Sequence, residues 1–464
     1  MGCTKNHSRT WNNWILIVIS IVGPLCSDPA DAAFAVKSAF TLGELYTDNI
    51  FFTKDKDHDF VTTLTPTLSI LYAPAGEIAP TLNLNISPSG LIFARHSELN
   101  NFGDNLNVNG GYTYQYSPRL SFNVSDVLGR QGGYSLGPLT QGVFQLPSTP
   151  TSPPPIGGTL PGQGNQNLSN FTSGQANSQI WNNFALLGTY LYRPDMNFTG
   201  GYTNNVVHYI DQGGTDLYQT IGVRGVYNWR RDHNLHAGYW ISIYTTRNDG
   251  TSVVNNFDFG DDYFSNIQIQ LSPTLTLAAS TGISFNTGNS GPTVANNSNV
   301  TIIKIWETAT LSAGLQQGLT PSFAVSSISN TTSLYSYFNM RLTEKLNAIA
   351  GVNFALYRTD DGNFRTFQTS SGLQYQFNPW LSSNLFYSYR WSDTSSRAAA
   401  ASSNVLQAGI VRANSVYVSL TAAFDLWPNA GLARSISSSA LSPIVRTPFP
   451  VTIPAPSSTP TPVP

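Results

Sequence analysis

Residues 105–125, NLNVNGGYTYQYSPRLSFNVS, alternate between apolar and polar side chains on both sides of a Ser-Pro-Arg corner. In an extended chain, one face before the corner would carry Leu106, Val108, Gly110, Tyr112, Tyr114 and Tyr116, and the other Asn107, Asn109, Gly111, Thr113 and Gln115. After the corner, Leu120, Phe122 and Val124 continue the apolar face. A period of two is typical of β-strands. The stretch therefore predicts two strands joined by a tight turn.

The same pattern returns along the chain, and short corners separate its segments. The six corners are Ser117-Pro118-Arg119, Arg193-Pro194-Asp195, Arg230-Arg231-Asp232, Ser272-Pro273-Thr274, Thr343-Glu344-Lys345 and Asn378-Pro379-Trp380. Proline presets a turn angle and cannot donate to a strand ladder, so it marks corners and not strands. The chain is predicted to be one long meander.

Longer connections rich in Asn, Gly, Asp and Ser alternate with these corners. They lie at 47–59, 95–103, 129–176, 211–215, 247–257, 286–299, 358–363 and 393–405. If short corners lie on one side and long connections on the other, the meander has about 18 strands and both termini on the short side. The alternative is about 16 strands, because the two connections expected within residues 317–331 are short and have few clear turn residues.

The composition is unusual for a soluble protein. Charged residues make up 10% of the 464-residue chain and hydrophobic residues 41%. A charged fraction of about 25% is usual, and here Asn, Ser, Thr, Gln and Gly replace it. The net charge of −2 argues against nucleic acid as a partner.

Residues 1–32 are predicted to be a signal peptide. Lys5 and Arg9 precede an apolar run at 14–22, and Ala30 and Ala32 fit a small-x-small site that is cleaved after Ala32. The run is shorter than the roughly 20 residues of a membrane helix. The alternative is an N-terminal anchor that is never cleaved. Both cysteines, Cys3 and Cys26, lie in this segment, so the mature chain would have no disulfide and no Cys-ligated metal.

Strand length distinguishes a barrel from a β-propeller, the soluble fold with a similar repeat. The alternating runs are roughly 11 to 14 residues long, against about 5–6 in soluble strands. Aromatic residues bracket them, as at Trp181 and Tyr192 and at Trp380 and Trp391. Eleven residues tilted by about 40° rise roughly 28 Å, close to the ~25 Å apolar band of outer-membrane barrels.

We therefore predict an all-β fold, a transmembrane antiparallel up-and-down β-barrel of about 16–18 strands. The barrel would span residues 33–424. A long flexible outer loop is expected at 129–176, and a Pro-rich disordered tail at 425–464.

A short motif near the predicted start of the barrel carries a family resemblance. In GELYTDNIFFT, residues 43–53, Tyr46, Asp48, Asn49, Ile50 and Phe51 form the pattern Y-x-D-N-I-F. With it, the chain resembles the β-barrel porins encoded near bacterial exopolysaccharide and exosortase genes. The resemblance implies an outer-membrane location. Such barrels commonly end at an aromatic residue that the barrel-assembly machinery reads; Phe424 fits this, although a Pro-rich tail follows it.

The polar faces of the predicted strands carry four basic residues: Arg224, Lys304, Arg341 and Arg390. Their polar companions are Asn109, Gln115, Gln268, Gln270, Thr310, Gln316, Asn339, Gln374, Gln376 and Asn384. An Arg or Lys that faced lipid at mid-depth would cost ~2–4 kcal/mol. We therefore expect the four in the lumen, where they tune selectivity or simply fill the wall. Amides and hydroxyls suit neutral hydroxylated solutes such as sugars better than strong ion selection, which uses rings of charge.

No catalytic, cofactor or metal site is expected. The G-x-S-x-G match at 133–137 precedes Pro138 and lacks the strand-turn-helix context of a nucleophile. Asp55, Asp57 and Asp59 have the spacing of calcium ligands, but the Gly and Glu of a calcium loop are missing, so a solvated acidic outer loop is preferred. The histidines after residue 32 form no i, i+4 or H-x-H pair: His58, His96, His208, His233 and His236.

The sequence therefore predicts a porin-like channel in the outer membrane of a Gram-negative-type bacterium, and not an enzyme. It would pass small polar solutes, such as sugars, or take part in exopolysaccharide export. The expected partners are outer-membrane lipid, the barrel-assembly machinery, and polysaccharide or small polar solutes as cargo. The alternatives are a non-conducting structural or adhesion barrel that acts through its outer loops and, least favoured, an outer-membrane hydrolase.

Overall fold

The computed structural model describes residues 32–74, 80–132, 178–210, 213–230, 233–246, 250–264, 275–288, 291–322, 327–359, 362–396 and 408–427. These residues contain eighteen strands: β1 (Ala32–Thr47), β2 (Asp59–Pro74), β3 (Thr81–Phe93), β4 (Asn101–Ser117), β5 (Leu120–Gln131), β6 (Gln179–Arg193), β7 (Met196–Tyr209), β8 (Thr215–Arg230), β9 (His233–Thr246), β10 (Gly250–Phe264), β11 (Leu275–Gly288), β12 (Gly291–Ile305), β13 (Ala309–Ser322), β14 (Ser327–Arg341), β15 (Leu346–Thr359), β16 (Gly362–Asn378), β17 (Leu381–Thr394) and β18 (Gly409–Trp427). A 3₁₀ turn, η2 (Ser97–Leu99), precedes β4. No helix in this part of the chain has the length and apolar character that a membrane crossing requires.

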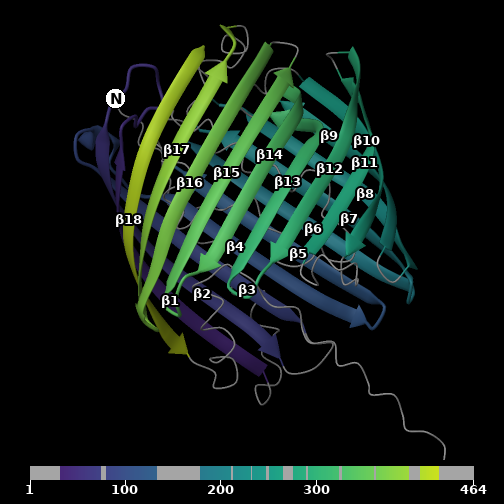
Figure 1. The fold of residues 1–464 in the computed structure, drawn as a ribbon, viewed down its shortest axis with the longest axis horizontal. Coiled ribbons are helices and arrows are strands. Elements are labelled where there is room, and N and C mark those ends of the chain that lie inside the picture. The colour runs from purple at the N-terminus through teal and green to yellow at the C-terminus, as the bar shows by residue number, and fades with distance from the viewer. Residues whose placement is uncertain are drawn as a thin grey trace, which may run out of the picture.

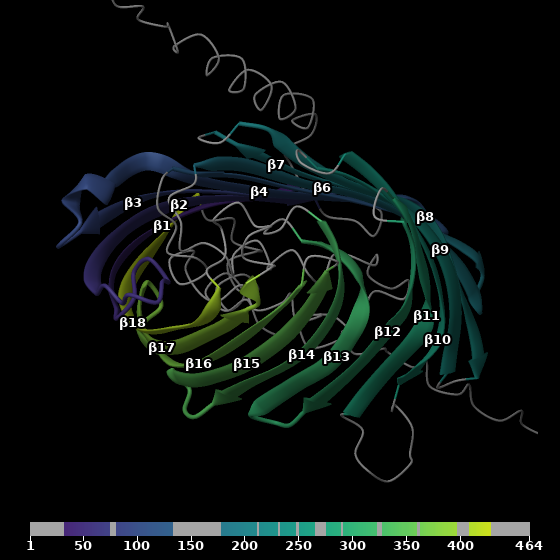
Figure 2. The same ribbon diagram turned by 90° about the horizontal axis from the view of Figure 1, so that it is seen from above.

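The strands form one antiparallel sheet that closes on itself (Figure 1, Figure 2). Each strand pairs with its neighbours in sequence, and β1 also pairs with β18, from Val36 opposite Trp427 to Thr47 opposite Ser415. Closure leaves no unpaired sheet edge. The structure confirms the predicted all-β, antiparallel, up-and-down barrel, and its 18 strands match the upper end of the predicted number.

Local side-chain hydrogen bonds form the tight corners. Ser117, Thr343 and Asn378 occupy the same position in three of the turns. Their side-chain oxygens accept from the amide two residues later: Arg119 N to Ser117 Oγ (3.3 Å), Lys345 N to Thr343 Oγ1 (3.2 Å) and Trp380 N to Asn378 Oδ1 (3.1 Å). These bonds are typical of tight turns that begin with Ser, Thr or Asn. The predicted corners at 117–119, 193–195, 343–345 and 378–380 are confirmed.

Three connections that were predicted to be long are mostly strand. Residues 250–257 belong to β10, residues 286–288 end β11 and residues 291–299 begin β12. Similarly, β15 reaches Thr359 and β16 begins at Gly362. Their Asn, Ser and Thr residues favour turns in isolation, but pairing with both neighbouring strands overrides that preference. At the end of the strands where β1 meets β2, the four longest connections join consecutive strands, from β17 round to β6: 48–58, 94–100, 132–178 and 395–408.

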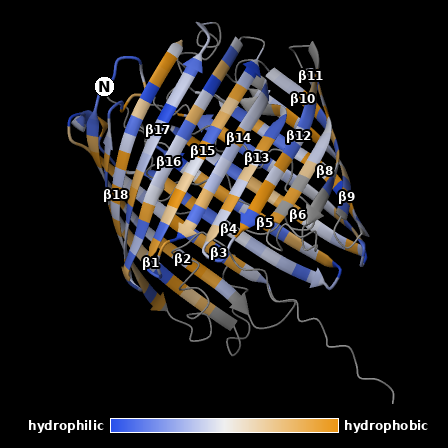
Figure 3. Cartoon of the chain, in the orientation of Figure 1, coloured by the Kyte–Doolittle hydropathy of each residue, from blue (hydrophilic) through white to orange (hydrophobic). Residues whose placement is uncertain are grey.

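Hydrophobic and hydrophilic residues alternate along many of the strands (Figure 3). The exposures place the apolar ones mainly on the outer face. In β8, Ile221 and Val223 are exposed on the outside, whereas Thr220 and Arg224 are buried on the inside. Because directly paired residues point to the same face, the register extends this assignment around the barrel. We call the end with the 118–119 turn the short-turn end, and the end with loop 48–58 the long-loop end.

Exposed aromatic side chains lie at the short-turn end of strands all around the barrel, from β4 to β18. They are Tyr116, Tyr192, Trp229, Trp306, Trp380 and Phe424. Trp181 and Tyr192, which are predicted to bracket one strand, both lie in β6 but on opposite faces. Trp181 pairs with Gly129 and with the buried Val207, so it lies on the inner face. The two residues are an odd number of positions apart, and an odd separation places side chains on opposite faces of a strand.

Several predicted features lie outside the described residues. They are nearly all of the signal peptide, the G-x-S-x-G match, most of the 129–176 loop, Arg231 and Asp232, the Ser272-Pro273-Thr274 corner, Gln268 and Gln270, and the tail from residue 428. At the C-terminal end of the barrel, β18 continues past Phe424 to Trp427.

Candidate functional site

Amide and hydroxyl side chains line much of the inner face. Of the polar wall residues predicted from the sequence, those that the structure describes all lie there: Asn109, Gln115, Thr310, Gln316, Asn339, Gln374, Gln376 and Asn384. Neighbouring strands also bond through these groups. Asn384 Nδ2 donates to Ser419 Oγ (3.2 Å), and the Thr41 and Thr421 hydroxyls are 2.9 Å apart across the β1–β18 closure.

Three of the four predicted lumen cations lie on the inner face. Arg224 and Arg390 are each 8% exposed, and their register partners are inner-face residues. Arg341 shares a face with the buried Tyr337, and its side chain is exposed at the short-turn end. Its backbone amide donates to Thr308 O (2.7 Å), which places it beside the β12–β13 turn.

The predicted lumen position of Lys304 is wrong. Lys304 pairs with Leu275 and Leu311, and it shares a strand face with the exposed Ile302, so it lies on the outer face. Its Nζ is 5.9 Å from the ring centroid of Trp306 at the short-turn end. A lysine near the end of an outer face can extend its ammonium group beyond the apolar band. The cost of ~2–4 kcal/mol for an outward-facing Lys applies at mid-depth of the membrane and not near its surface.

Arg224 is part of a buried ion pair in the wall. Its Nη2 donates to Asp258 Oδ2, and His236 Nε2 lies 3.8 Å from the same oxygen. Two inner-face glycines make room for this cluster. A Cβ at Gly238 would collide with the Asp258 carboxylate, and one at Gly260 would lie 2.7 Å from His236 Nε2. The charge of Arg224 is therefore balanced within the wall.

Loop 48–58 is fixed to β18 by its first two residues. Asp48 accepts from the Asn414 amide (2.6 Å), from Asn414 Nδ2 (2.8 Å) and from Lys56 Nζ (2.6 Å). Asn49 Nδ2 donates to Arg412 O (2.8 Å) and Thr53 O (2.6 Å), and its Oδ1 accepts from Thr53 N (3.0 Å). Each of the two side chains satisfies several backbone or polar groups, so the loop has a defined course.

The next three residues of the loop pack against the inner face. Ile50 is 5% exposed and belongs to a buried cluster with Leu45, Val61, Leu91, Phe93, Tyr337, Ile349, Phe386 and Tyr417, which are inner-face residues. Phe51 packs against this cluster and meets the His96 ring edge-on at 5.0 Å. The Phe52 ring lies under the Arg390 guanidinium, at 4.5 Å from centroid to Cζ. Ile50, Phe51 and Phe52 therefore bend the loop toward the inside of the barrel.

Phe52 adopts an unfavourable backbone conformation in this arrangement. Its φ of 48° is the only positive φ of a non-glycine among the described residues. A bulky residue in this region is strained by about 1–3 kcal/mol. The Asn49 hydrogen bonds and the Arg390 contact hold it there.

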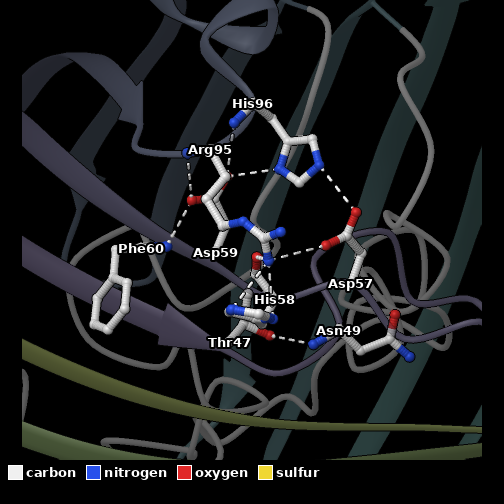
Figure 4. A network of polar contacts seen from close by, with 8 residues as sticks. All are labelled: Thr47, Asn49, Asp57, His58, Asp59, Phe60, Arg95 and His96. Carbon is white, nitrogen blue, oxygen red and sulfur yellow. Dashed lines mark hydrogen bonds and ion pairs between the residues drawn. The ribbon is translucent and has the colours of Figure 1, made fainter.

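A polar network joins this loop to the β3–β4 connection (Figure 4). The fully buried Asp59 accepts at Oδ1 from the amides of Phe60 (2.7 Å) and Arg95 (3.0 Å). Its Oδ2 accepts from the His96 amide (3.2 Å) and His96 Nδ1 (2.8 Å). The other ring nitrogen, Nε2, lies 3.0 Å from Asp57 Oδ2. Because carboxylates only accept hydrogen bonds, this geometry favours a doubly protonated His96.

The network shifts the pKa values of both partners. The hydrogen bond to Asp59 raises the pKa of His96 above its usual 6.5; burial opposes this, and Asp57 adds to it. Burial alone would raise the pKa of Asp59, but the bonds from His96, Arg95 and Phe60 together hold it below 3.8. The ion pair therefore persists to a higher pH than the usual pKa of a histidine would allow.

The prediction that residues 55–59 form a solvated acidic loop is correct for only part of this segment. Asp55 is exposed, but Asp57 is half-buried and Asp59 is fully buried. The sequence contained one relevant signal, the apolar Ile50-Phe51-Phe52 within a connection. Arg95 and His96 are too far along the chain for local spacing to reveal them. Among the described residues, no three His, Cys, Asp or Glu side chains are grouped as metal ligands.

No protein-family model and no curated protein matches the chain. Solved structures with a similar fold include OccAB4 of Acinetobacter baumannii, at 10% identity and TM-score 0.42, covering 86% of this chain and 100% of that one. OccK2 (OpdF) of Pseudomonas aeruginosa, in complex with glucuronate, matches at 11% identity and TM-score 0.42, covering 85% and 98%. OpdK of Pseudomonas aeruginosa, with vanillate, matches at 13% identity and TM-score 0.42, covering 84% and 99%.

The His96 network generates a prediction about pH. A raised His96 pKa means that its contribution to loop stability is complete below pH 6.5 and is lost as the pH rises through the raised value. Titration of the His96 ring by NMR should show that Asp59→Asn lowers its pKa most and Asp57→Asn less. Hydrogen exchange of residues 48–58 should speed up as His96 deprotonates.

Asp55→Asn is the matched control, because it removes the same charge from the same loop without touching His96. An equal effect of Asp55→Asn, or an unchanged His96 pKa in Asp59→Asn, would contradict the network.

Proposed function

We propose that the protein is a channel in the outer membrane of a Gram-negative-type bacterium, with the long-loop end outside and the short-turn end in the periplasm. Three features support this location: the closed sheet, the apolar outer face, and the ring of exposed aromatic residues at the short-turn end. In lipid, every backbone polar group must be paired within the protein, and a closed barrel does this with strands. Insertion would depend on the barrel-assembly machinery and on outer-membrane lipid as partners.

We assign small, neutral, hydroxylated solutes, such as sugars, as the cargo. The observation that carries this assignment is the inner face, where amides and hydroxyls predominate and the Arg224 charge is balanced by Asp258. Such a wall exchanges hydrogen bonds with solute hydroxyls without a strong charge preference. A role in exopolysaccharide export would use the same sugar chemistry, and it rests on the Y-x-D-N-I-F resemblance at Tyr46–Phe51.

Loop 48–58 acts in this proposal as a constriction. Ile50 and Phe51 fix the loop on the apolar part of the inner face. Phe52 adds a cation–π contact with Arg390 on β17. The barrel would then conduct less than its strand number alone would allow.

Phe52→Ala should increase single-channel conductance in planar bilayers. The substitution removes a ring from the inside of the barrel, and it loosens the loop by the ~0.5–2 kcal/mol of a cation–π contact. Phe102→Ala is the matched control, since Phe102 is 64% exposed on the outer face at the same end. Equal conductance in the wild type and Phe52→Ala would exclude loop 48–58 as the constriction.

Arg341→Gln should shift ion preference toward cations while leaving folding intact. A unit charge about 8 Å from a passing ion in water contributes about 0.5 kcal/mol, or roughly twofold in relative permeability. Lys304→Gln is an unusually close control. It removes the same charge beside the same 306–308 turn, but from the outer face, and reversal potentials should not change.

The non-conducting adhesion barrel remains the competing function, because the longest connections of the long-loop end join consecutive strands, from β17 round to β6. The same recordings decide between the two. If folded wild-type protein gives no stepwise conductance, even after deletion of residues 140–170, the adhesion function replaces the channel.

A further inference from the structure

Three arginines lie close together on the outer face of the barrel at the long-loop end. Arg358 on β15 pairs with Asn363 on β16, Arg365 on β16 pairs with Asp393 on β17, and Arg412 on β18 pairs with Trp391 on β17. They share their strand faces with the exposed Val352, Leu373 and Val416, respectively. All three side chains are exposed. We call Arg358, Arg365 and Arg412 the outer arginine patch.

Among the described residues, the patch carries a net positive charge. Asp393 is the one carboxylate between the three arginines on this face of β15–β18. No salt bridge joins any of the three to a described residue. Arg130 on β5, by contrast, lies on the outer face at the same end and is paired with Asp104 at 3.0 Å. Among the described residues of this end of the outer face, the three arginines therefore differ from Arg130 in having no carboxylate bound to them.

An aromatic row fixes the position of the patch relative to the apolar band. Phe354, Phe367 and Trp391 are register partners on adjacent strands, and the Phe367 and Tyr389 rings meet at 6.3 Å. Arg358 and Arg365 lie beyond this row, toward the strand ends, and Arg412 lies level with it. Aromatic residues are typical of the membrane–water interface. Arginines at and above such a row lie where lipid headgroups begin.

We propose that the outer arginine patch binds the phosphate groups of a phosphorylated glycolipid of the outer leaflet. Guanidinium groups bind phosphate oxygens through paired, charge-assisted hydrogen bonds. The exposed Asn363, on the same face, offers an amide to sugar hydroxyls. This inference rests on the proposed membrane location and orientation, because only then does the patch face outer-leaflet headgroups.

The geometry favours a glycolipid over an ordinary phospholipid. The three arginines span four adjacent strands, and neighbouring strands are about 4.8 Å apart. The patch is thus roughly 14 Å wide, which matches two phosphates separated by sugars better than a single phosphate.

Native mass spectrometry of the full-length folded protein in detergent tests this, with bisphosphorylated lipid A as the probe. The triple variant Arg358→Gln, Arg365→Gln, Arg412→Gln should bind at least ~10-fold more weakly than the wild type. Dephosphorylated lipid A and phosphatidylglycerol should bind the wild type more weakly than the probe does. The control variant Arg119→Gln, Arg130→Gln, Arg193→Gln removes as many charges elsewhere, and it should bind like the wild type.

Two further measurements separate the possible failures. Folding of each variant is checked by its mobility on gels before and after heating, and a salt titration of the wild type tests the charge dependence without any substitution. Equal lipid A binding by the wild type and a folded triple variant, or equal binding of phosphatidylglycerol and lipid A, would overturn the inference. Conductance of the same samples reports on the channel: a conducting barrel that does not bind lipid A refutes only this inference, whereas a silent barrel that binds it refutes only the channel.

Discussion

The pairing of β1 with β18 is the constraint on which the rest of the structure depends. It converts a meander into a closed sheet in which each strand has two partners. Closure divides every strand into an outer and an inner row of side chains, because alternate residues must point to opposite sides. Apolar residues can then fill the outer row while amides and hydroxyls fill the inner one. A charged fraction of 10% is compatible with this division, since neither row needs many charges.

Loop 48–58 shows how such a wall can be modified locally. The inner face is polar over much of its area, yet it carries one buried apolar cluster, and that is where Ile50 and Phe51 pack. Asp48 and Asn49 fix the start of the loop to β18, and the Asp59–His96 pair fixes its end to the β3–β4 connection. The loop is thus held by β18 on one side of the β1–β2 hairpin and by the β3–β4 connection on the other. Because both ends of the loop are fixed, it can hold Phe52 at its positive φ.

The sequence was sufficient for the architecture, because alternation and corner chemistry are local signals. The 117–119 and 378–380 turns could be read from Ser-Pro and Asn-Pro alone. The sequence alone misplaces Lys304 and does not reveal that Trp181 points inward. Whether a side chain points outward depends on the exact register of its strand, and whether an outward charge is tolerated depends on its depth in the membrane. Composition determines neither. The His96 network was missed because its residues come from two connections that only closure of the sheet brings together. The Y-x-D-N-I-F stretch is recognisable in the sequence as a motif, but its packing against the inner face depends on an apolar cluster that distant strands contribute.

Closure itself is tested most directly by cross-linking Thr41→Cys to Thr421→Cys in a chain whose Cys3 and Cys26 have been replaced by serine. The two threonines are register partners with hydroxyls 2.9 Å apart. Directly opposed residues of antiparallel strands have Cα atoms about 4.5–5.5 Å apart, within the roughly 4.4–6.8 Å over which a disulfide can form. Oxidation of the protein in membranes should form the bond and make the denatured chain migrate faster on gels until it is reduced. The pair Thr41→Cys and Ser419→Cys, two residues out of register, should cross-link far less. Failure of the first pair to cross-link, or preference for the second, would contradict the closed barrel described for this chain.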